Sequence, residues 1–284
     1  MLGLTLQLNL KMTDMMKKIA CLSLLILLLV SCSNTNTNTN NTNAQNRSYP
    51  EDMLDFESPY TTTVKYEGAS LDITDFINAL VVEEEEGMQT DGGNFIDAWL
   101  YFMRHGKQKP GTTVFVDKKN GYASITSEYT IEYDGGVNKC KIIYEMGLWN
   151  CDDGEHKLFA LNHNFMVNGR YREGQTTGIN FSLYEDARHI MWNVVAEDLG
   201  VNVHPDTDED SEYDSETGLT LVKDRETGKL LKLNDDEYLR WLEEKPVVTY
   251  WLPKQGKDII AEIHHPTRTE TFKLVWDGMQ FNRQ

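Results

Sequence analysis

Six carboxylates alternate along one short stretch of the chain, and oxygen ligands at alternate positions are what a Ca²⁺-binding loop needs. Aligned from its first aspartate, the stretch has Ser211 where a calcium loop has its tight-turn glycine and Thr217 where a bidentate carboxylate closes the site. An acidic loop exposed to solvent, with no cofactor, is therefore the favoured interpretation. The alternative is a weak Ca²⁺ site, whose ligands would be Asp206, Asp208, Asp210, Glu212 and Asp214.

A smaller group of metal-binding residue types lies near the end of the chain. Glu262 and His264 are two residues apart, so a strand would place both on one face at a spacing suited to a metal ion. His265 would point the opposite way, and the sequence shows no third ligand. Histidines at the surface are the favoured interpretation.

Aromatic side chains are the remaining resource for ligand contact. The chain has six tryptophans, most of which we expect in the core. Trp149 differs because strand alternation places it opposite Ile142, Tyr144 and Met146. The favoured interpretation is a sheet covered on both sides, with a pair of helices over Trp149. The alternative is an exposed Trp149 that contacts a ligand.

Cys140 and Cys151 are the two cysteines of the expected folded body. Residues 139–151 are predicted to form one strand, which separates the two sulfur atoms by roughly 35 Å and puts them on opposite faces. A disulfide requires Cβ atoms only about 4 Å apart. We therefore predict two buried free thiols and no bridge.

Local motifs for catalysis are absent from the sequence. It contains no Gly-x-Ser-x-Gly, no glycine-rich phosphate loop and no His-Glu-x-x-His. Carboxylate pairs that come from distant strands leave no such signature, so a hydrolase of that kind stays open.

The amino-terminal region combines a positive segment, an apolar run and a cysteine. Lys17 and Lys18 precede about a dozen mostly apolar residues, which is the length of a signal-peptide core and too short to span a bilayer. Leu29-Val30-Ser31-Cys32 follows and resembles the processing site of bacterial lipoproteins. The resemblance covers only about the first 33 residues. It implies that Cys32 carries the lipid anchor and that the protein belongs to the cell envelope, attached to the inner or outer membrane and facing the periplasm or the cell surface.

The segment after Cys32 is rich in asparagine and threonine, and its composition is similar to that of tethers in lipoproteins of the Bacteroidota. It has too few apolar residues to form a core, so we expect a flexible tether. Without residues 1–31 the chain keeps 24 basic and 44 acidic residues. This charge excludes nucleic acid as a partner and requires the lipid to provide membrane attachment.

Two helices are expected to open the folded body, because apolar residues recur at helical spacing from about Asp72 to Gly87 and from about Asn94 to Gly106. Asn-Gly and Asp-Gly turns then separate short runs rich in valine, isoleucine and tyrosine, which indicates consecutive hairpins. The predicted strands cover residues 113–116, 122–126, 129–133, 139–149, 157–165, 179–184 and 190–195.

The last part of the chain resembles the middle in pattern. A small hairpin is predicted from residues 219–222 and 229–233. A short helix should follow, because Asn234 and Glu237 make a capping-box pattern. Further strands are predicted at 247–252, 259–263, 271–276 and 279–282. The predicted fold class is α+β: an N-terminal helix pair, a predominantly antiparallel β-meander, and a short helix before a C-terminal β-meander. The expected organisation is 1–31 signal peptide, 32–48 lipidated cysteine and tether, 49–200 helix pair plus sheet, 201–218 acidic loop, and 219–284 C-terminal hairpins, whose independence as a domain stays open.

Three functions are compatible with these patterns. The leading hypothesis is a lipid-anchored, non-enzymatic binding or interaction module whose partner is a glycan or an envelope protein. The second is a glycan-active hydrolase with dispersed carboxylates, and the third is a calcium-responsive structural module. A cleft with two facing acids, one of them with a raised pKa, would favour the second.

Overall fold

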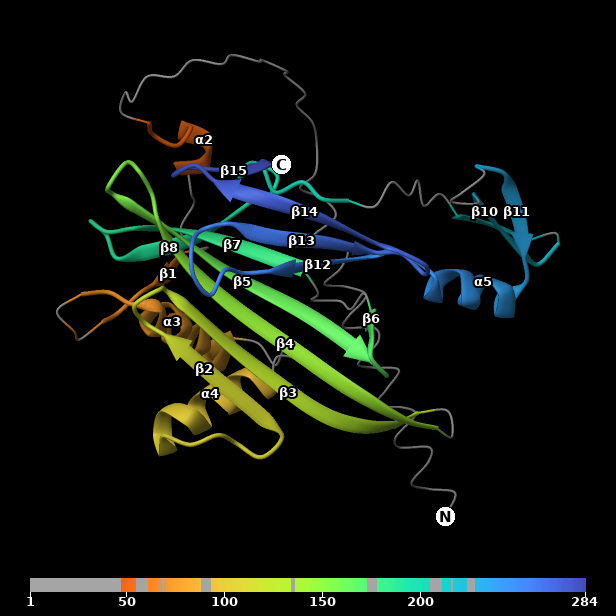
Figure 1. Cartoon of the computed structure of the whole chain (residues 1–284), viewed down its shortest axis with the longest axis horizontal. Helices are drawn as coiled ribbons and strands as arrows, with labels where there is room; N and C mark the ends of the chain where they lie inside the picture. The colour runs from red at the N-terminus through yellow and green to blue at the C-terminus, as the bar shows by residue number, and fades with distance from the viewer. Residues whose placement is uncertain are drawn as a thin grey trace. The chain divides into compact units, whose positions relative to one another are not determined.

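Antiparallel strands make up most of the structure, a computed structural model shown in Figure 1. It describes residues 47–54, 61–66, 68, 70–87, 93–133, 136–172, 178–204, 211–215, 217–223 and 228–284. The strands form an eight-stranded, a four-stranded and a three-stranded sheet. Residues 46–284 constitute one compact unit.

The eight-stranded sheet is the framework of that unit. Its strands follow the order β1-β8-β7-β5-β4-β3-β2, and β6 extends the sheet by pairing with the far end of β5. The strand pairs of this sheet are antiparallel, and most strands that are neighbours in space are also neighbours in sequence. The strands are β1 (Thr61–Thr63), β2 (Thr112–Asp117), β3 (Tyr122–Tyr133), β4 (Gly136–Asn150), β5 (His156–Val167), β6 (Arg170–Arg172), β7 (Gly178–Glu185) and β8 (Ile190–Val194).

Helices α3 (Ile73–Gly87) and α4 (Gly93–His105) cover one face of this sheet. Ile73, Phe76 and Ile77 are fully buried because their spacing puts them on one side of α3. They contact the β4 side chains that lie on the same face of the sheet as Ile142 and Met146. The helices also contact each other, since Trp99 Nε1 donates a 2.8 Å hydrogen bond to Asn78 Oδ1.

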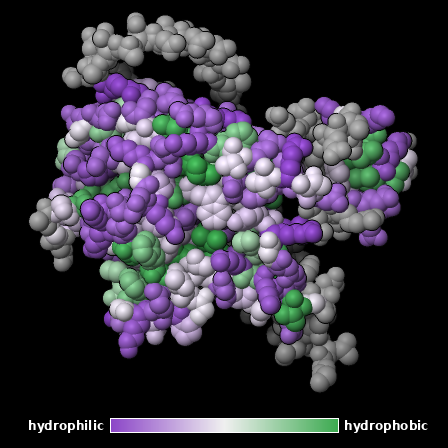
Figure 2. Space-filling model, in the orientation of Figure 1, coloured by the Kyte–Doolittle hydropathy of each residue, from purple (hydrophilic) through white to green (hydrophobic). Residues whose placement is uncertain are grey.

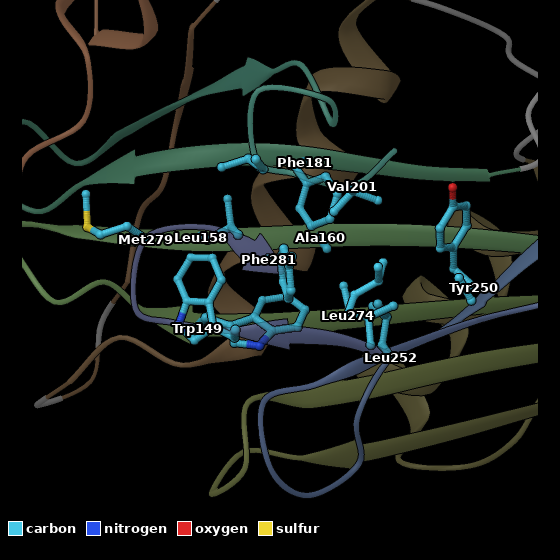
Figure 3. Packing of buried hydrophobic residues seen from close by; sticks show 14 of the residues in the cluster. Trp149, Leu158, Ala160, Phe181, Val201, Tyr250, Leu252, Leu274, Met279 and Phe281 are labelled. Carbon is cyan, nitrogen blue, oxygen red and sulfur yellow. The ribbon is translucent and has the colours of Figure 1, made fainter. Parts of the chain in front are cut away.

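The four-stranded sheet covers the opposite face. It consists of β12 (Val247–Trp251), β13 (Ile259–His264), β14 (Thr269–Trp276) and β15 (Phe281–Arg283), in that order. Figure 3 shows Trp149, Leu158 and Phe181 of the large sheet pointing toward Phe281 and Leu274 of the smaller one. The C-terminal strands therefore form their own sheet but share a core with the first.

Gly147 makes room for Trp149 in that shared core. A Cβ atom at this position would lie 2.6 Å from the ring of Trp149, so only glycine lets the indole lie across the strand. The indole Nε1 donates a 2.9 Å hydrogen bond to the Lys257 carbonyl, and Trp149 is 3% exposed.

A small unit precedes the C-terminal sheet in the chain. Strands β9 (Ser211–Asp214), β10 (Leu219–Lys223) and β11 (Leu230–Leu233) form the three-stranded sheet, and α5 (Asp235–Glu243) packs on it. Strand β9 lies inside the segment 201–218 for which we predicted a loop. Glu212 and Asp214 lie on β9, where alternate positions share one face of the strand.

The predicted fold class, α+β with an N-terminal helix pair, is wrong. The described chain is mostly antiparallel β-sheet in three sheets, and helices are few. Strand β1 precedes α3 in the chain and pairs with β8, so the sheet begins before the helices. Strand β1 consists of three threonines, so it has no alternation of polar and apolar residues that would identify it as a strand. The strong helical periodicity of the next segments led to a fold class in which the helices were too prominent.

Residues 47–54, which include α2 (Glu51–Leu54), pack on one end of the large sheet. We call residues 47–54 the strap. Tyr49 is 5% exposed, Arg47 pairs with Asp277 at 2.9 Å, and Trp192 Nε1 donates to the Met53 carbonyl at 2.9 Å. Among the described residues, no helix is long and apolar enough to cross a membrane.

Candidate functional site

One part of the large sheet is left uncovered by the C-terminal sheet. Strand β12 crosses β5 where the Tyr250 carbonyl accepts hydrogen bonds from Asn162 and Asn164 at 2.6 and 2.7 Å. Strand alternation puts Met166 on the same face, one step beyond this crossing. The face therefore continues past the edge of the C-terminal sheet.

A row of side chains follows this uncovered part across four strands. Glu128 pairs with Lys141, Lys141 with Met166, and Met166 with Tyr171, and directly paired residues share a face. Thr130 and Lys139 form the next pair on β3 and β4. We call this set the open sheet face, and it comprises Glu128, Thr130, Lys139, Lys141, Met166 and Tyr171.

A cavity of about 620 Å³ is lined by every residue of the open sheet face except Tyr171. This volume is in the range of ligand pockets, about 300–1,000 Å³. Thr130 and Lys139 are exposed, whereas Met166 and Tyr171 are half-buried. The lining residues are Glu128, Tyr129, Thr130, Lys139, Cys140, Lys141, Met166 and Gly169. Figure 2 shows hydrophilic residues over much of the surface in this view, with hydrophobic residues in separate patches.

Tyr171 ends the row beside an aromatic cluster from the C-terminal sheet. Its ring centroid is 4.4 Å from that of His264 and 6.1 Å from that of Trp251. Trp251 Nε1 donates to Glu262 Oε2 at 2.8 Å, and His264 Nε2 lies 2.9 Å from Thr249 Oγ1. Burial lowers the pKa of His264, which keeps its imidazole neutral at neutral pH.

A buried carboxylate lies where β12 crosses the large sheet. Glu145 is 4% exposed and accepts hydrogen bonds from Tyr122 Oη at 2.7 Å and from the Leu252 backbone N–H at 3.1 Å. Asn162 Nδ2 donates to it at 3.4 Å. Burial raises the pKa of Glu145 above its ordinary value, and these donors oppose the shift. The hydrogen bonds join the two sheets, so we assign Glu145 a structural role.

A second polar cluster lies under the strap, at the turn between β4 and β5. Tyr49 Oη is 3.3 Å from Cys151 Sγ, and His156 Nδ1 is 2.8 Å from Asp153 Oδ2. Cysteine, histidine and aspartate are the residue types of a thiol catalyst. Burial raises the pKa of Cys151 to about 12, however, so the sulfur stays a thiol at neutral pH and is a poor nucleophile.

The residues selected from sequence have different outcomes. Cys32 and the acids Asp206, Asp208 and Asp210 lie outside the described residues. Glu212 lies on β9, and the Asp214 carboxylate accepts hydrogen bonds from the backbone N–H and the hydroxyl of Thr217 at 3.3 and 2.7 Å. In the described part of the chain, no three histidine, cysteine or acidic side chains gather as a metal site.

Trp149 is buried in the core between the two sheets. The cover that we expected for it was wrong: the helices lie over the other face, and the C-terminal sheet covers Trp149. The two free, buried cysteines are confirmed. Glu262 and His264 do share a strand face, with Glu262 Oε2 and His264 Nε2 3.5 Å apart.

The sequence analysis missed Lys139, Lys141, Met166 and Tyr171. The sequence signal that was available is the change from Ile143 to Lys141 and Lys139 along one face of β4. That change marks where cover ends, but the position of β12 over the sheet depends on contacts distant in sequence.

Comparisons with protein-family models, with curated proteins and with solved structures found no match.

Proposed function

We propose that this chain is a lipid-anchored binding module of the cell envelope and that its ligand lies on the open sheet face. The observation that carries the proposal is the 620 Å³ cavity at the open sheet face, beyond the crossing of β12 and β5 where the cover by the C-terminal sheet ends. A cavity of this size with several polar side chains in its lining is suited to holding a ligand.

The position of this face fits a protein held at its N-terminus. The strap contacts the large sheet at Cys151, whereas Lys141 lies ten residues back along the chain, roughly 33 Å away in an extended strand. A chain anchored by lipid at Cys32 enters the folded body at the strap. The open sheet face is therefore at the end of β4 that is remote from this entry.

The two buried reactive groups support binding over catalysis. Glu145 is held by hydrogen bonds that join the sheets, and Cys151 lies under Tyr49 as a protonated thiol. The hydrolase hypothesis requires two acids facing each other across a cleft, and the contacts of Glu145 are instead with donors. Neither group borders the cavity.

The test is a binding screen followed by mapping of the bound site. The mature chain with Cys32→Ser would be screened against a glycan array and against separated envelope proteins, and hydrogen exchange would be measured with and without each ligand found. We expect protection of amides within residues 128–141 and 166–171. Protection confined to other segments, or chemical turnover of the ligand, would contradict the proposal.

A further inference from the structure

We infer that the open sheet face binds an uncharged, hydroxyl-rich glycan chain. This inference rests on the proposed function and specifies its ligand class. It follows from the shape of the face, its balance of charge and its mixture of polar and apolar side chains.

The shape favours an extended ligand. The row from Glu128 to Tyr171 crosses four strands, so it runs about 14 Å perpendicular to them at the usual strand spacing. Side chains in such a row present their ends along a line. A chain molecule lying on the sheet can contact each of them, whereas a compact ligand would meet only one or two.

The charge of the face favours an uncharged ligand. The full chain has a net charge of −18, but this face carries Lys139 and Lys141 against Glu128 and its neighbour in alternation, Glu132. Lys141 Nζ and Glu128 Oε1 are 3.2 Å apart and partly exposed, so both keep capacity for further hydrogen bonds. Balanced donors and acceptors suit hydroxyl groups, which donate and accept.

Tyr171 and Met166 supply the apolar part of the recognition. Both are half-buried. Met166 lines the cavity, and Tyr171 lies next to it, with its ring tilted by 30° against that of His264, a contact that holds the Tyr171 ring in one orientation. A rigid aromatic ring offers a large contact area at little entropic cost. The C–H faces of sugar rings need such a surface, while their hydroxyl groups need the neighbouring lysine, glutamate and threonine side chains.

The experiment compares neutral and charged oligosaccharides on the same protein. The mature chain with Cys32→Ser would be titrated calorimetrically with chitotetraose, cellotetraose and a hyaluronan tetrasaccharide, which contains uronic acids. We expect at least one neutral tetrasaccharide to bind and the uronate-containing one to bind at least tenfold more weakly. Equal or preferential binding of the hyaluronan tetrasaccharide would overturn the inference.

Variants then place the binding on the open sheet face. Tyr171→Ala should weaken binding at least tenfold, and Tyr213→Ala, at an exposed tyrosine of β9, is its control. Thr130→Arg blocks the face with a bulky side chain at an exposed position, with Thr63→Arg at an exposed position of β1 as its control. Unchanged affinity in folded Thr130→Arg protein would refute the site.

The outcomes separate this inference from the proposed function. If neither neutral tetrasaccharide binds but the screen finds an anionic glycan or a protein ligand that protects residues 128–141, the glycan class is wrong and the binding module stands. If no ligand protects the open sheet face, both are wrong.

Discussion

Tyr49 and Cys151 meet at the point where the chain enters the folded body, and the hydroxyl and the thiol are 3.3 Å apart. Because the thiol is buried under the strap and its pKa is raised to about 12, it should react slowly with thiol reagents. Tyr49→Ala removes the cover. In a Cys140→Ser background we expect Cys151 to be labelled at least tenfold faster by a chromogenic disulfide reagent at about pH 8.

Arg47→Ala serves as the comparison, because an exposed ion pair contributes only about 0–1 kcal/mol. It should change the labelling rate much less than Tyr49→Ala. Equal rates in all three proteins would show that Tyr49 does not limit access to Cys151.

Glu145 makes a prediction about pH. Burial raises its pKa in the folded state above the ordinary value of 4.5, so in the interval above that value the folded protein holds a proton that the unfolded protein releases. This contribution to the free energy of unfolding therefore decreases as pH rises through the folded pKa. In the Glu145→Gln protein this position cannot ionise. The free energy of unfolding of this variant, taken relative to wild type, should therefore be higher at about pH 8 than at about pH 5.

Urea unfolding at both pH values measures this difference. Glu128→Gln, at an exposed glutamate of the same sheet face, is the control and should show no comparable change. A constant stability difference between the Glu145→Gln protein and wild type would mean that Glu145 is not perturbed by burial.

Among the elements, helix α5 shows how directly a local pattern can specify structure. Asn234 and Glu237 each accept a 3.0 Å hydrogen bond from the other's backbone N–H, as the capping-box pattern predicted. Asn234→Ala should destabilise this helix by about 0.5–2 kcal/mol. Faster hydrogen exchange confined to α5 would confirm it, and Asn180→Ala, at an exposed position of β7, should leave α5 unchanged.

The acidic segment has a simple test at the same scale. Because an exposed acidic segment is favoured over a calcium site, we expect no heat of binding and no shift of the melting temperature when Ca²⁺ is added to the mature chain. A saturable signal that disappears in Asp208→Asn protein would instead support the weak Ca²⁺ site.

The bounds of the strands were predicted less accurately than helix α5. Residues 122–126 and 129–133 were assigned to two strands, yet β3 is continuous from Tyr122 to Tyr133. The two predicted strands included neither Ser127 nor Glu128, but both residues pair with β4, through Ile142 and Lys141. Pairing with a long partner strand overrides a local break in propensity.

For the whole molecule, we propose that a lipid anchor on Cys32 determines its location. The chain is too acidic to adhere to an anionic membrane, so lipid on Cys32 should be the only attachment. Cys32→Ser should move the protein from the membrane to the soluble fraction after cell fractionation, and Cys21→Ser, within the predicted signal peptide, should not. Membrane retention of the Cys32→Ser protein would contradict lipid anchoring.

Several properties of this protein were readable from local sequence alone. Alternation along β4 placed Cys140 and Cys151 on opposite faces, and both are free and buried. Turn pairs such as Asn168-Gly169 predicted hairpins, and the positive φ angles of 51° and 81° at these two residues are what such a turn requires. Both outcomes depend on residues that are close in sequence, so the types of those residues are enough to predict them.

Tertiary structure alone decided which surface covers which. Trp149 is covered by a sheet that begins about 100 residues later, and the open sheet face exists because that sheet ends at the crossing of β12 and β5. Strand alternation gives two faces but does not say which element packs on each. That choice depends on the fit of whole apolar surfaces, and such a fit arises only when distant segments meet.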